Sequence, residues 1–85
     1  MSIDEFADKN NLHIEIKKRE KEKPGTKNRF YAKFTNCTIG GVYGYGNGRT
    51  RKSALQSYIR RIKGRIITAN PSQSRNIRVP IDIHV

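Results

Sequence analysis

The sequence predicts an α+β domain in which a small antiparallel sheet, in the order β-β-β-α-β, carries one helix on one face. Two observations support this class. Apolar and polar residues alternate in several short runs, as in half-buried strands, and one later run repeats its apolar residues at helical spacing. The 85 residues have room for one core, so we expect a single basic domain over residues 12–85, after a polar lead-in over residues 1–11.

The lead-in is expected to contain no more than one helical turn, around Ile3 and Phe6. Two strands should follow it, because apolar side chains occupy every second position from Leu12 to Ile16 and from Phe30 to Phe34. A Pro-Gly pair marks a turn between these runs, which makes them a hairpin. A third extended segment is expected from Thr38 to Gly46, with a bend at its glycine pair.

The clearest predicted element is a helix over residues 51–63. Thr50 is a good N-cap, and Gly64 stands where a left-handed residue commonly ends a helix. The apolar stripe of this helix consists of Ala54, Leu55, Tyr58, Ile59 and Ile62. A final strand is expected over residues 77–85, and Pro80 places this strand at an edge of the sheet or its end at a bulge. Because open edges pair with other strands, we expect a homodimer through this C-terminal strand.

The charge is strongly positive, at +11, and unevenly distributed along the chain. Between Lys23 and Ile81 there is no acidic residue, yet most of the 18 Lys and Arg residues lie there. Without acidic neighbours in sequence, these bases should create a broad field that attracts polyanions, so we expect nucleic acid or a nucleoprotein as partner. The lone Cys37 excludes an internal disulfide, and no run suits a signal peptide or a membrane span. We therefore predict a cytoplasmic protein without membrane contact.

A glycine-rich segment, Gly44 to Gly48, leads directly into the predicted helix. It fits neither the dinucleotide-binding nor the phosphate-loop pattern, so we interpret it as a tight turn that needs positive φ. Arg49, Arg51 and Lys52 then crowd the helix N-terminus, where the macrodipole disfavours cations. Free backbone N–H groups beside these cations predict a phosphate site. The alternative is three solvated side chains with nothing bound.

Two further groups extend this prediction. Lys52, Arg60 and Lys63 should share the solvent side of the helix, with Arg65 just beyond, where they would follow a phosphate backbone. On the sheet face away from the helix, tyrosines lie between Lys17, Arg19 and Lys33, an arrangement that can stack nucleobases. Cross-strand tyrosine packing or a dimer face would use the same residues equally well. The predicted nucleic-acid-binding residues are Arg49, Arg51, Lys52, Arg60, Lys63, Arg65, Lys33, Tyr43 and Tyr45, with Tyr31 beside the last three.

Catalysis has little support in the sequence. His13 and His84 are far apart, Cys37 lacks a local base, and no metal-ligand spacing occurs, so we expect no enzyme, no metal and no cofactor. The sequence thus predicts a small non-catalytic DNA- or RNA-binding protein with phosphate contacts and little base specificity. A protein-interaction module is the first rival, and an enzyme acting on nucleic acid, which lacks paired carboxylates here, is the second.

Two local strings resemble known families. GNGRTRKSA, residues 46–54, resembles the G-x-G-x-[ST]-K-K-x-A start of the second helix in double-stranded RNA-binding domains, which implies phosphate contacts by Arg51 and Lys52. YAKFTNCTI and GYGNGRTRKSAL, within residues 29–63, are similar to the β-β-β-α core of HicB-type antitoxins and small phage-borne relatives. That resemblance implies a phage protein in a bacterial host, with an anti-defence role against a host nucleic-acid-handling protein. Bases stand where the antitoxin helix usually opens with acids, which favours an anion-binding variant.

Overall fold

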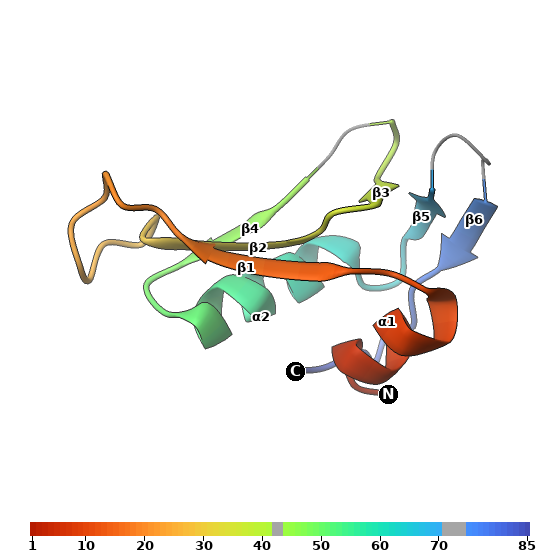
Figure 1. Cartoon of the computed structure of the whole chain (residues 1–85). Helices are drawn as coiled ribbons and strands as arrows, with labels where there is room; N and C mark the ends of the chain where they lie inside the picture. Colours follow the sequence, from red (N-terminus) through yellow and green to blue (C-terminus); the bar gives the residue numbers. More distant parts are fainter. Residues whose placement is uncertain (42–43, 71–74) are drawn as a thin grey trace.

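The computed structural model describes residues 1–41, 44–70 and 75–85. The α+β class is confirmed, but the described residues form two helices and two small antiparallel sheets, where one sheet and one helix were expected. The first sheet has the order β1-β2-β4 and the second the order β3-β5-β6 (Figure 1). Helix α2 packs across the first sheet, and the second sheet lies beside its C-terminal end.

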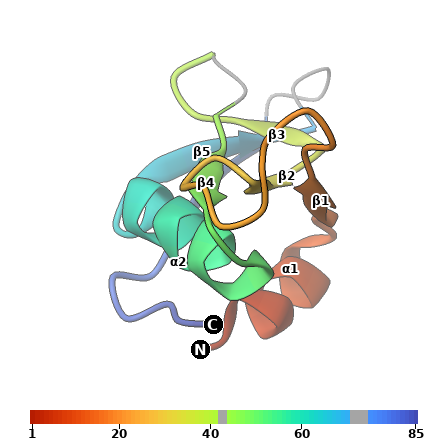
Figure 2. The ribbon, with the colours of Figure 1, turned by 90° about the vertical axis from the view of Figure 1, so that its left-hand side faces the viewer.

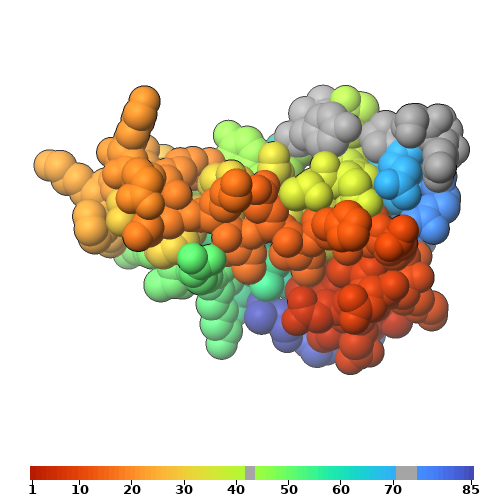
Figure 3. Space-filling view, viewed as in Figure 1, coloured from red at the N-terminus to blue at the C-terminus, as the bar shows by residue number. Residues whose placement is uncertain are grey.

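The first sheet contains the predicted hairpin. Strands β1 (Ile14–Lys18) and β2 (Phe30–Phe34) pair antiparallel, and β2 also pairs with β4 (Gly46–Gly48). Ala32 and Phe34 are buried toward the helix, as the alternation predicted. The connection between β1 and β2 projects from the body of the molecule (Figures 1 and 3).

The second sheet was not predicted. After β2 the chain enters β3 (Cys37–Thr38), which pairs with β5 (Ile66–Ala69), and β5 pairs with β6 (Arg75–Arg78). The expected third strand, from Thr38 to Gly46, is therefore divided between two sheets. The division follows from backbone conformation, because Gly40 and Gly41 both have positive φ and turn the chain back toward β4.

The N-terminal segment is α1 (Ile3–Asn10), a helix of 8 residues instead of one turn. Ser2 caps it by accepting a hydrogen bond from the Glu5 backbone N–H at 3.1 Å. Ile3 and Phe6 are buried, and the Phe6 ring lies 6.3 Å from that of Phe34. Residues 1–11 are thus part of the core and not a lead-in outside it.

Helix α2 (Arg51–Ile62) confirms the predicted helix and its Thr50 cap, and Gly64 follows it with a φ of 72°. The interpretation of the preceding glycines was wrong, because the glycines with positive φ do not include those of β4. A Cβ at Gly46 would overlap the backbone nitrogen of Tyr58, and one at Gly48 that of Ala54. These glycines therefore let the helix pack directly on the strand backbone.

The final strand is shorter than expected. It ends at Arg78, and the following residues leave the sheet and run back to α1 (Figure 2). There His84 forms a parallel bridge with Ser2, so the two chain ends lie together. Ile77 pairs within β6, but beyond Arg78 the apolar alternation reflects burial of Val79 and Ile83 in this returning segment. The homodimer stays a prediction, and its C-terminal strand is limited to the four residues of β6.

Candidate functional site

The arginines fall into two groups by the partners of their guanidinium groups. In the described part of the chain, three ion pairs occur, and none of them involves an arginine. One group donates hydrogen bonds to main-chain carbonyls and comprises Arg19, Arg29, Arg51, Arg75 and Arg78. The other group forms no ion pair with a described residue and comprises Arg49, Arg60, Arg61 and Arg65. All four of these side chains are exposed.

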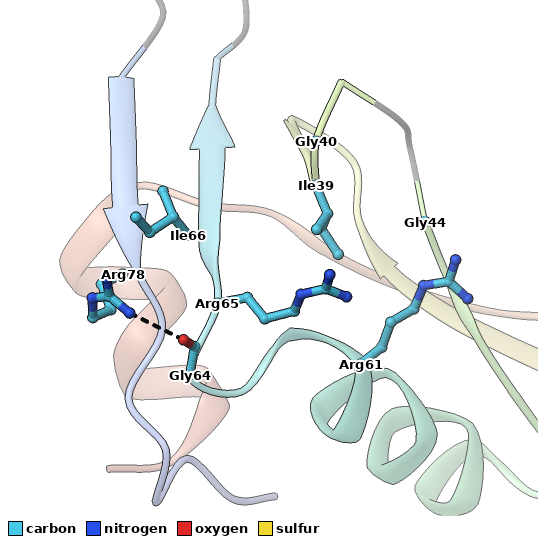
Figure 4. A pocket seen from close by; sticks show the side chains of 8 residues that line it. All are labelled: Ile39, Gly40, Gly44, Arg61, Gly64, Arg65, Ile66 and Arg78. Carbon is cyan, nitrogen blue, oxygen red and sulfur yellow. Dashed lines mark hydrogen bonds between the residues drawn. The ribbon is translucent and has the colours of Figure 1, made fainter.

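Arg61 and Arg65 belong to a groove between the two sheets. A pocket of about 660 Å³ lies there, lined by Ile39, Gly40, Gly44, Arg61, Gly64, Arg65, Ile66 and Arg78. Figure 4 shows the Arg61 side chain extending toward Gly44 and the Arg65 side chain extending beneath Ile39. Arg78 lies on the other side of β5 and donates to the Gly64 carbonyl at 3.1 Å. None of the described residues that line this groove is acidic, so no carboxylate among them competes for the two extended guanidinium groups.

The main chain places these two arginines. Arg61 lies in the last turn of α2, and its Nε would be 3.0 Å from a Cβ at Gly44. Glycine at this position therefore lets the guanidinium pass close to the backbone that leads into β4. Arg65 follows the left-handed Gly64, which redirects the chain from the helix into β5. Arg65 was predicted as a site residue and Arg61 was not, because helical spacing did not place Arg61 on the predicted solvent side of the helix.

A second cluster covers the outer face of the first sheet, as predicted. The rings of Tyr31 and Tyr45 are 6.3 Å apart and edge-on. The Arg19 guanidinium carbon lies 4.9 Å from the Tyr31 ring centroid and 5.3 Å from that of Tyr45. Lys33 lies 6.0 Å from the Tyr31 ring. Tyr43, also predicted for this face, lies outside the described residues.

The acidic residue Glu15 also belongs to this face, and its contacts were missed. Glu15 lies opposite Lys33 in the register of β1 and β2, and its carboxylate is 3.9 Å from the Lys33 ammonium and 3.0 Å from that of Lys17. The hydrogen bond to Glu15 raises the pKa of Lys17. The expectation that Lys33 has no acidic neighbour was therefore wrong, because strand pairing joins residues that are far apart in sequence.

At the N-terminus of α2, more polar groups are hydrogen-bonded within the protein than expected. Thr50 and Ser53 form a capping box, in which each side chain accepts a hydrogen bond from the other's backbone N–H at 3.0 Å. Arg51 turns back over the Phe30 ring and donates to the Ile16 carbonyl at 3.0 Å. Two of the terminal N–H groups and one predicted cation are thus already engaged within the protein.

The solvent side of α2 carries the remaining predicted bases. Lys52 and Arg60 line a shallow pocket of about 500 Å³ with Gln56 and His84. Lys63 and Arg49 are exposed at the two ends of the helix. The structure thus separates the predicted residues into this helix side, the groove and the sheet face.

The free thiol of Cys37 lies in the core and not at the surface. Cys37 is buried, its Sγ is 3.8 Å from the Tyr58 hydroxyl, and burial raises the pKa of both groups. Among residues 1–41, 44–70 and 75–85, no three His, Cys, Asp or Glu side chains come together as a metal site. Neither helix in these ranges is long and apolar enough to cross a membrane.

Comparison of the chain with protein-family models, curated proteins and solved structures finds no match. The resemblance of its central segment to HicB-type antitoxins stays a prediction.

Proposed function

We propose that this protein is a small non-catalytic nucleic-acid-binding protein that holds phosphate groups with little base specificity. The observation that carries the proposal is the groove into which Arg61 and Arg65 extend, because none of its described lining residues is acidic. A guanidinium binds phosphate oxygens through two parallel hydrogen bonds, and it does so best where no carboxylate competes.

The distribution of charge favours a polymer over a single small anion. Exposed cations also lie outside the groove, on the solvent side of α2, where Lys52 and Arg60 line a second pocket. A free phosphate would engage only one such site, whereas regularly spaced phosphates engage several at once and release bound counterions at each. The net charge of +11 supports this kind of ligand.

Salt-dependent binding tests the proposal. The parent protein should bind duplex and single-stranded nucleic acid in the micromolar range at low salt, with log K falling linearly against log salt. The double variant Arg61→Gln with Arg65→Gln should lose about tenfold or more in affinity. Its salt dependence on a duplex should also become shallower by about 0.9 for each phosphate contact removed.

A matched control is the double variant Lys21→Gln with Lys23→Gln, which removes the same charge from the hairpin, beside Glu20 and Glu22. It should cost less affinity than the groove variant. Equal losses would show that net charge alone drives binding and that the groove is not the site. Absence of binding to every nucleic acid at low salt would contradict the proposal and favour a protein partner.

A further inference from the structure

We infer that the ligand is single-stranded, and that one of its bases stacks on Tyr45 in a small pocket on the outer face of the first sheet. This inference rests on the proposed function and deepens it. The pocket has a volume of about 220 Å³ and is lined by Arg19, Glu22, Asn28, Tyr45 and Asn47. It is smaller than the roughly 300–1,000 Å³ of sites for drug-sized ligands, which suits one flat ring system.

The wall of this pocket is held in place before any ligand arrives. Arg19 donates hydrogen bonds to the Asn28 carbonyl at 2.9 Å and to the Asn47 side chain, while it lies over both tyrosine rings. The edge-on contact with Tyr31 fixes the Tyr45 ring from another side. Tyr45 nevertheless keeps 44% of its surface exposed. A fixed, open aromatic ring is a stacking platform, because little conformational entropy is lost when a base binds it.

The chemistry of the rim suits a nucleobase better than a purely apolar group. Besides Tyr45, the pocket is lined by two asparagines, a glutamate and an arginine, residue types that offer both donors and acceptors to the edge of a bound base. A base within a duplex is stacked and paired, and only an unpaired base can enter such a pocket.

The pocket and the groove adjoin along the chain. Gly44 lines the groove beside Arg61, and the next residue, Tyr45, lines the pocket. A single strand with one base on Tyr45 would continue past Gly44 toward the groove that Arg61 lines. Base stacking and phosphate binding would then be two contacts of the same strand.

A tryptophan at position 45 provides a direct test, because the natural chain contains no tryptophan. Tyr45→Trp keeps an aromatic platform, and its fluorescence should be quenched when oligothymidylate or oligouridylate binds. A strand of equal length made of abasic sugar-phosphate units should bind but should quench far less. Equal quenching by the abasic strand, or full binding of oligothymidylate without quenching, would overturn the inference.

Affinity measurements with Tyr45→Leu complete the test. The variant should bind oligothymidylate between about fivefold and a hundredfold more weakly than Tyr45→Phe does. Its affinity for a duplex should match that of the parent. Parallel losses on duplex and single strand would overturn the stacking inference and leave the proposed function intact, whereas failure of the parent to bind either one would overturn both.

Discussion

The two faces of the first sheet differ in the side chains they can accept, although successive residues of a strand point to opposite faces. On the inner face, Gly46 and Gly48 lie against the backbone of α2, and a Cβ at either position would overlap it. On the outer face, Tyr45 and Asn47 surround Arg19, and the Tyr45 ring remains partly open to solvent. Gly46, where no side chain fits, thus directly follows Tyr45, which presents a large ring to solvent.

Because the two faces differ in this way, substitutions at alternate residues of β4 should affect either stability or binding, but not both. The inner face is limited by space, because close-packed backbone cannot move aside for an added group. The outer face is defined by hydrogen bonds and ring contacts of Arg19, which cost less to remove because water can replace them. Substitutions on the two faces should therefore change different measurements.

The largest effect is expected from Gly46→Val. Its branched side chain would enter the space held by the Tyr58 backbone nitrogen, and helix main chain cannot rotate away as a flexible side chain can. We expect a loss of more than about 3 kcal/mol in the free energy of unfolding, measured by urea titration. The outer neighbour is the control. Asn47→Ala removes one hydrogen bond from Arg19 and should cost no more than about 1 kcal/mol. Similar losses at both positions would break the distinction between the faces.

A smaller effect on stability is expected from two ionisable groups in the core, the thiol of Cys37 and the hydroxyl of Tyr58. Burial raises the pKa of Cys37 and Tyr58 above their ordinary values of 9.0 and 10.0. The unfolded chain therefore releases these protons at lower pH than the folded protein does. Stability should be full below about pH 9 and should fall as the pH rises further. Unfolding titrations across this range should show a shallower decline for Cys37→Ser, and an unchanged slope would contradict the assignment.

Sequence patterns predicted the elements whose signals are local. The hairpin followed from alternation, and α2 followed from its apolar stripe between Thr50 and Gly64. Helix α1 was underestimated because its apolar face is short and lies among acids. The second sheet was missed because β3 has only two residues, and because β5 and β6 are defined as strands by their pairing with each other. Such pairing joins distant segments and leaves little trace in either one.

The candidate site was predicted in part for the same reason. Alternation placed Tyr31, Lys33 and Tyr45 on one face, which the structure confirms. No sequence pattern indicates which carbonyl a guanidinium will reach, so Arg51 looked equivalent to Lys52. Nor did any pattern bring Arg61 to Gly44, because that contact depends on how the helix end meets the strand.

The smallest effect on stability is expected from single alanine substitutions of Arg51 and Lys52, the first two residues of α2. Arg51 donates to the Ile16 carbonyl and covers Phe30, so Arg51→Ala should lower the free energy of unfolding by about 1 kcal/mol. Lys52 is an exposed cation in the first helical turn, so Lys52→Ala should raise it by a few tenths of a kcal/mol, roughly the range of helix-dipole effects. Nucleic-acid affinity should fall more in the Lys52 variant, because the Arg51 guanidinium already donates to the Ile16 carbonyl and lies over Phe30. Thermal unfolding at low ionic strength, where the dipole effect is least screened, would measure the two shifts. If Arg51→Ala left stability unchanged and reduced affinity more than Lys52→Ala did, the Ile16 contact would contribute nothing, and Arg51 would belong with the phosphate-binding cations.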